Sequence, residues 1–131
     1  MILLAPLAMQ ALQIAAPAQP PSADVVVIGQ RLKTWKGKVG DAARSPVRCR
    51  TVKSTGDRDV DAIGCRTMVE CFSKMRGRIT ALGDRRQPKA AREMLRASVE
   101  RDIGACVDER HDALVAELAE HRFQARQAVQ P

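Results

Sequence analysis

Aromatic side chains are almost absent from this chain of 131 residues, which has no Tyr, one Trp and two Phe. A single domain of this length with so few large side chains has a modest core and usually needs cross-links. Recognition of single-stranded nucleic acid depends on aromatic side chains that stack on bases. The net charge of +7 alone therefore does not make nucleic acid the expected partner.

The usual motifs of metal, redox and hydrolytic sites are also missing. The sequence has no Cys-x-x-Cys pair and no His-Glu-x-x-His motif. Cys65, Cys71, Cys106 and His111 form the alternative metal set, but structural zinc sites usually present ligand pairs about two to four residues apart. His111 and His121 have no nucleophile motif beside them and are expected to face solvent on a helix. We therefore predict no catalytic residue, no metal and no cofactor.

Charge is absent from the beginning of the chain, because residues 1–18 contain no Lys, Arg, Asp or Glu. The apolar stretch ends in Ala16-Pro17-Ala18, the small-x-small pattern that signal peptidase accepts. It is shorter than the roughly 20 apolar residues of a membrane span. We predict a signal peptide over 1–18, a linker over 19–23 and a periplasmic or secreted mature protein.

The next segments predict two short strands and a helix. The β-branched run Asp24–Gly29 and the segment Val47–Val52 are typical of strands. Asp57, Asp59 and Asp61 follow, where a helix favours a cap and negative charge. A calcium loop is disfavoured because it would need Gly at position 62 and Glu at position 68, which are Ala62 and Met68. Apolar residues then recur at helical spacing and form one stripe: Val60, Ile63, Met68, Cys71, Met75 and Ile79.

A second helix is predicted to begin at Pro88, a residue suited to the first helical turn. Its stripe is Ala91, Leu95, Val99, Ile103, Cys106 and Val107. After Val107 the apolar phase drifts, so the helix either breaks near 108–112 or continues past its packing partner. The two helices are separated by a short connection and should be antiparallel neighbours. A single domain over 24–124 and a disordered tail over 125–131 are expected.

Four cysteines in an exported chain predict two disulfides, with three possible connectivities. Cys71 and Cys106 lie in the middle of the two apolar stripes, which should face each other. Cys65 lies at the edge of its stripe, within reach of the strand that carries Cys49. The helical phase therefore favours the pairs Cys49–Cys65 and Cys71–Cys106.

Charge is distributed unevenly along the two predicted helices. Residues 100–120 are mainly acidic, whereas residues 74–96 contain eight cations against Asp84 and Glu93. The cations are Lys74, Arg76, Arg78, Arg85, Arg86, Lys89, Arg92 and Arg96. They form either an ordinary solvated face, the interpretation that the sequence favours, or a surface for an anionic partner.

Two local segments resemble parts of the TonB system. Cys49–Gly56, followed by Val60-Asp-Ala and Cys65, resembles a strand, turn and helix start in the carboxy-terminal domain of TonB, a periplasmic energy transducer. In some TonB sequences cysteines bracket this segment at similar spacing, which also implies the Cys49–Cys65 pair. Asp24–Gly29 is similar to a TonB box, a segment that binds TonB by strand addition. The whole chain resembles small uncharacterised periplasmic proteins.

The sequence thus predicts an α+β protein, mainly α, in which two short amino-terminal strands precede a disulfide-stapled antiparallel helical hairpin. Its expected role is a non-enzymatic interaction or structural module of the cell envelope. The alternatives are a basic module that binds anionic lipid or polysaccharide, and a TonB-linked accessory protein. A membrane span after leader removal is not expected.

Overall fold

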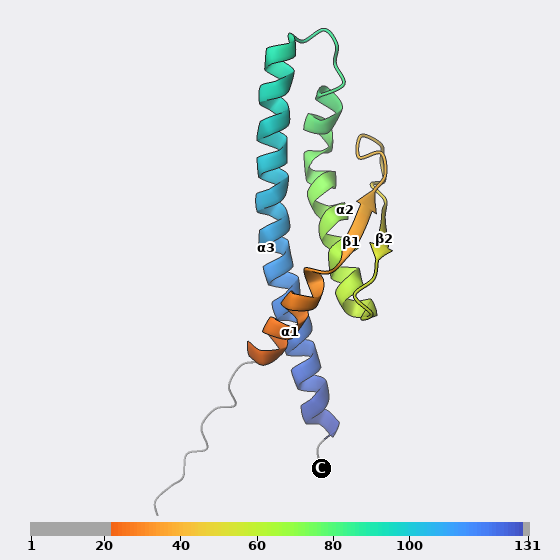
Figure 1. The fold of residues 1–131 in the computed structure, drawn as a ribbon, viewed down its shortest axis with the longest axis vertical. Helices are drawn as coiled ribbons and strands as arrows, with labels where there is room; N and C mark the ends of the chain where they lie inside the picture. The colour runs from red at the N-terminus through yellow and green to blue at the C-terminus, as the bar shows by residue number, and fades with distance from the viewer. Residues whose placement is uncertain (1–21, 130–131) are drawn as a thin grey trace, which may run out of the picture.

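The computed structural model describes residues 22–129, which form a long helical hairpin with a two-stranded ribbon and a short helix packed against it (Figure 1). In chain order the elements are α1 (Ser22–Leu32), β1 (Lys36–Val39), β2 (Cys49–Lys53), α2 (Arg58–Ala81) and α3 (Lys89–Val129). The predicted signal peptide (1–18), residues 19–21 of the predicted linker and residues 130–131 lie outside this range. The predicted class is confirmed: two short antiparallel strands precede an antiparallel helical hairpin.

The two hairpin helices differ greatly in length. α2 has 24 residues and α3 has 41, which correspond to about 36 and 60 Å at 1.5 Å per residue. α3 therefore extends well past the beginning of α2. The hydrophobic core forms where α1 and the first turns of α2 meet the second half of α3. Its buried members are Ile28, Leu32, Val60, Ile63, Leu114, Val115 and Ala119.

The core explains the phase drift in the sequence of α3. Val99 is buried in the hairpin, whereas Leu114, Val115 and Ala119 belong to the core that also contains residues of α1. Because its packing partners change along its length, α3 shifts its apolar face without a break. Of the two alternatives, the continuous helix is the correct one. The disordered tail predicted over 125–131 is wrong as far as Val129, where α3 ends.

The strand predicted over 24–29 is wrong, because these residues form most of α1. Ile28 and Leu32 are one helical turn apart and both are buried in the core. Asp24 also pairs with Arg126 on α3, which stabilises the helix in place. β-branched residues favour strands mainly through packing on a pleated surface, so tertiary contacts override that preference. The residues that resemble a TonB box are therefore helical.

A ribbon of β1 and β2 takes the place of the two predicted strands. β1 was not predicted, while β2 lies within the predicted strand 47–52 except for its last residue, Lys53. The ring of Trp35 lies against Gly64 of α2, where an added Cβ would come within 2.5 Å of it. The Trp35 indole Nε1 also donates a hydrogen bond to Thr51 Oγ1 at 3.0 Å. This side chain thus links the ribbon to α2.

Both predicted disulfides are present. Cys49 of β2 is joined to Cys65 of α2, and Cys71 of α2 is joined to Cys106 of α3. The first disulfide fixes the ribbon to α2, and the second fixes the two long helices to each other. Cys71 is fully buried. The helical-phase prediction of the pairing is therefore confirmed.

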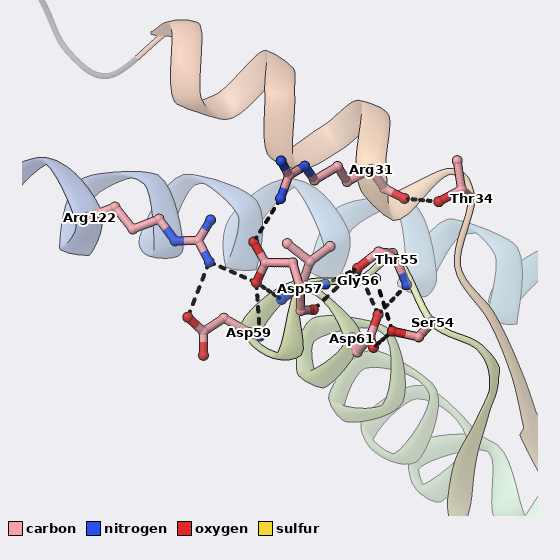
Figure 2. A network of polar contacts seen from close by, with 10 residues as sticks. Arg31, Thr34, Ser54, Thr55, Gly56, Asp57, Asp59, Asp61 and Arg122 are labelled. Carbon is pink, nitrogen blue, oxygen red and sulfur yellow. Dashed lines mark hydrogen bonds and ion pairs between the residues drawn. The ribbon is translucent and has the colours of Figure 1, made fainter.

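Asp57 connects all three helices at the base of the hairpin (Figure 2). As the amino-terminal cap of α2, its side chain accepts hydrogen bonds from the backbone N–H groups of Asp59 and Val60. Its other contacts are ion pairs with Arg122 of α3 at 2.9 Å and Arg31 of α1 at 3.2 Å. The hydrogen bond from Arg122 is the main reason that the pKa of Asp57 lies below its ordinary value. The predicted cap is confirmed, and it also holds the other two helices.

The turn between β2 and α2 is held by Asp61. Its carboxylate accepts hydrogen bonds from the hydroxyl of Ser54 at 2.5 Å and from the backbone N–H of Thr55 at 2.8 Å (Figure 2). Gly56 follows with a φ of 83°, a left-handed conformation that glycine adopts without strain. The strand, turn and helix start implied by the TonB-like segment are thus present here.

Candidate functional site

The eight cations predicted as an anion-binding group are gathered at one end of the molecule, which we call the hairpin tip (residues 74–96). The tip comprises the end of α2, the connection and the beginning of α3, and it lies far from α1 (Figure 1). Lys89, Arg92 and Arg96 follow one another at spacings that place them on one face of α3. The eight cations, which are neighbours in the sequence, therefore also lie at the same end of the folded molecule.

Two of the eight cations already have partners within the tip and the hairpin. Arg78 donates hydrogen bonds to Ser98 and to Asp102, the latter at 2.6 Å, and so ties α2 to α3. Lys89 forms an exposed pair with Glu93 at 3.7 Å, which contributes little to stability. Within residues 22–129, the other six cations form no ion pair. They are Lys74, Arg76, Arg85, Arg86, Arg92 and Arg96.

The tip projects beyond the core rather than forming part of it. Among the described residues, none between 72 and 98 is fully buried. Cys71 is followed by about ten more residues of α2, which extend the hairpin by about 15 Å past the disulfide. Met94 is 76% exposed there. A projecting end with cations and an accessible apolar side chain is suited to contact with a charged surface.

A second group of cations lies on the ribbon and was not predicted as a site. Lys36 pairs in register with Lys53, and Lys38 pairs with Arg50. In the sequence these residues are separated by one or two neutral ones and are divided between two segments, so they do not form an obvious run. Knowledge of the strand pairing would have revealed this group. The pairing was not predicted because the Lys- and Gly-containing sequence of β1 is not typical of a strand.

His111 lies beside a cleft between α1 and α3, contrary to the predicted solvent-facing position. The cleft has a volume of about 690 Å³, and Asp108, Asp112 and Val115 also line it. Burial lowers the pKa of His111 despite the two neighbouring aspartates, which act in the opposite direction. Its Nε2 atom is buried and has no hydrogen-bond partner among the described residues. No hydrogen bond joins His111 to a carboxylate among the described residues.

The three cysteines of the alternative metal set, which also included His111, all form disulfides. Cys65 is bonded to Cys49, and Cys71 is bonded to Cys106. A metal-binding cysteine requires a thiolate, and all four cysteines are oxidised. The cysteines therefore serve as cross-links in this structure.

Comparisons with known proteins add no family to this description. No family model matches the chain, and no curated protein or solved structure is similar enough to count as a match. The site must therefore be interpreted from its own geometry and charge.

Proposed function

We propose that this protein is exported and acts as a non-enzymatic binding module of the cell envelope, with its hairpin tip attached to an anionic membrane surface. The observation that carries the proposal is the tip itself, where six cations that form no ion pair within residues 22–129 extend past the core. Basic clusters near a bilayer are attracted to anionic head groups by about 1 kcal/mol per Lys or Arg. Met94 adds an apolar side chain that can enter the interface.

Export is supported by the disulfides and by the predicted leader. Two disulfides are typical of small proteins from oxidising compartments. Between residues 22 and 129, no helix has the length and hydrophobicity needed to span a membrane. Attachment through the tip would therefore be peripheral, by charge and by shallow insertion.

Export is tested by expressing the full chain in a bacterial host and recording the mass of the purified protein without reductant. We expect a species that begins near Gln19 and is about 4 Da lighter than its reduced form, because each disulfide removes two hydrogens. A full-length cytoplasmic product with free thiols would contradict export.

Membrane attachment is tested by co-sedimentation of the oxidised protein with vesicles of phosphatidylglycerol and phosphatidylcholine. We expect binding that decreases as salt rises from 0.05 to about 0.5 M, because salt screens exposed charges. Vesicles of pure phosphatidylcholine should bind weakly. Binding that is equal for both compositions, or insensitive to salt, would refute the proposal.

The tip is tested with the triple variant Lys74→Gln, Arg85→Gln and Arg86→Gln. These three side chains are exposed and form no ion pair among the described residues, so the fold should be unaffected. Loss of about 3 kcal/mol of attraction would weaken vesicle binding about a hundredfold. The matched control is the triple variant Lys36→Gln, Lys38→Gln and Arg50→Gln, which removes the same charge from the ribbon. Equal losses in the two variants would mean that net charge, and not the tip, determines binding.

A further inference from the structure

The outer face of the ribbon holds a compact group of five cations. Antiparallel partners share a face of the sheet, so the pairs Lys36–Lys53 and Lys38–Arg50 each place two like charges side by side. Arg48 extends this face, because its carbonyl accepts a hydrogen bond from the Gly40 backbone N–H just beyond Lys38 and Arg50. All five side chains are exposed.

The opposite face of the ribbon is the one that packs on α2. Cys49 is the register partner of Val39 and is bonded to Cys65 of α2. Thr51 is the partner of Gly37 and accepts a hydrogen bond from the Trp35 indole. Because these residues alternate with Lys38 and Arg50 along the strands, those two cations project away from α2 and toward solvent, as do Lys36 and Arg48 two residues further along each strand. A register shift between Lys36 and Gly37 interrupts this alternation in β2 and brings Lys53 opposite Lys36.

Nothing in the ribbon compensates this positive charge. The segment 33–53 contains seven Lys and Arg residues but one acid, Asp41. Asp41 is paired with Arg44 at 3.1 Å in the loop between the strands. Like charges directly opposite each other destabilise a sheet, and within the described residues none of the five cations of the outer face takes part in an ion pair. An external anion would relieve this repulsion.

The spacing of the charges fits a chain with regularly repeated anionic groups. Cations two residues apart on a strand are separated by about 7 Å, and those on opposite strands by about 5 Å. Lys38, Arg48 and Arg50 also surround a hollow of about 400 Å³, lined in addition by Gly40 and Cys49. This space is sufficient for a sulfate, phosphate or carboxylate group of a linear polymer.

The chemistry of the face favours a polysaccharide over a nucleic acid or a bilayer. Trp35, the one aromatic residue of this region, is held between Gly37 and Gly64 and offers no platform for base stacking. Val52 is the exposed large apolar residue of β2, so the face has few apolar side chains that could insert into a bilayer. We propose that the outer face of the ribbon, formed by Lys36, Lys38, Arg48, Arg50 and Lys53, binds a linear anionic polysaccharide. This surface shares no residue with the hairpin tip and does not depend on membrane attachment.

The test uses the oxidised full-length protein and a short heparin oligosaccharide as the probe, titrated by calorimetry at about 0.15 M salt. The ribbon variant is Lys36→Gln, Lys38→Gln and Arg50→Gln, and the equal-charge control is Lys74→Gln, Arg85→Gln and Arg86→Gln at the tip. We expect the ribbon variant to raise the Kd for heparin about tenfold or more. The tip variant should raise it by no more than about twofold.

Two further arms separate this surface from its alternatives. The substitutions Lys36→Arg and Lys38→Arg keep the charge and should retain heparin binding, which distinguishes loss of charge from loss of the ribbon fold. A single-stranded oligonucleotide of equal charge should bind more weakly than heparin. Equal losses in the ribbon and tip variants would overturn the proposal. So would tighter, ribbon-dependent binding of the oligonucleotide, or failure of the wild-type protein to bind heparin.

Discussion

Replacement of Gly64 by alanine provides the sharpest test of how the ribbon packs on α2. Alanine is favoured over glycine inside a helix by about 1 kcal/mol. At Gly64, however, an added Cβ would lie 2.5 Å from the Cδ2 and Cε2 atoms of Trp35, so the ring must move. Overpacking of this kind costs about 1–3 kcal/mol. We expect Gly64→Ala to lower the free energy of unfolding by up to about 2 kcal/mol.

The control for this substitution lies in the same helix. A Cβ at Gly77 would meet no atom within 4 Å, so Gly77→Ala should stabilise the protein by up to about 1 kcal/mol. Both variants are measured by urea unfolding with the disulfides intact, followed by circular dichroism. Trp35 is the sole tryptophan, so its fluorescence reports ring displacement in Gly64→Ala directly. Equal stabilisation by the two substitutions, with unchanged emission, would refute the packing of Trp35 against α2.

Two further predictions concern the base of the hairpin and its cross-links. Arg122 lowers the pKa of Asp57, so the stability that this carboxylate contributes is complete above the ordinary value of 3.8 and is lost as pH falls through the lower pKa of the folded protein. Asp57→Asn should therefore make the free energy of unfolding less dependent on pH in urea titrations between about pH 5 and 2. An unchanged pH dependence would contradict the network around Asp57. Removal of the Cys71–Cys106 disulfide by paired alanine substitutions should lower the free energy of unfolding by about 4 kcal/mol. Removal of Cys49–Cys65, which closes a shorter loop, should lower it by about 3 kcal/mol. The reverse order of the two variants in thermal unfolding would contradict the chain-entropy reasoning.

The hairpin and the disulfide pairing could be predicted because each depends on a periodic pattern within a single helix. Asp57 precedes a regular apolar stripe, and Cys71 and Cys106 occupy the middle of stripes that face each other. Helical periodicity sets both the element and the direction in which each cysteine points. These features need no knowledge of distant parts of the chain.

The features that could not be predicted depend on partners far away in the sequence. The segment 24–29 has the composition of a strand, yet it is helical because Ile28 packs in the core and Asp24 meets Arg126. β1 has no apolar pattern of its own and exists through its pairing with β2. The cations at the tip could be found as a run, whereas those of the ribbon required the register.

α2 contains one cysteine of each disulfide, with Cys65 joined to the ribbon and Cys71 joined to α3. The hydrophobic core lies nearer the base of the hairpin and includes neither cross-link. The disulfides therefore add covalent links outside this cluster, alongside the contacts of Trp35 and Arg78, to the elements that carry the two cationic surfaces. In a reduced chain, noncovalent contacts such as the hydrogen bonds of Trp35 and Arg78 would alone hold the ribbon and the tip in place. Disulfide formation should therefore favour simultaneous contact of both surfaces with one anionic layer.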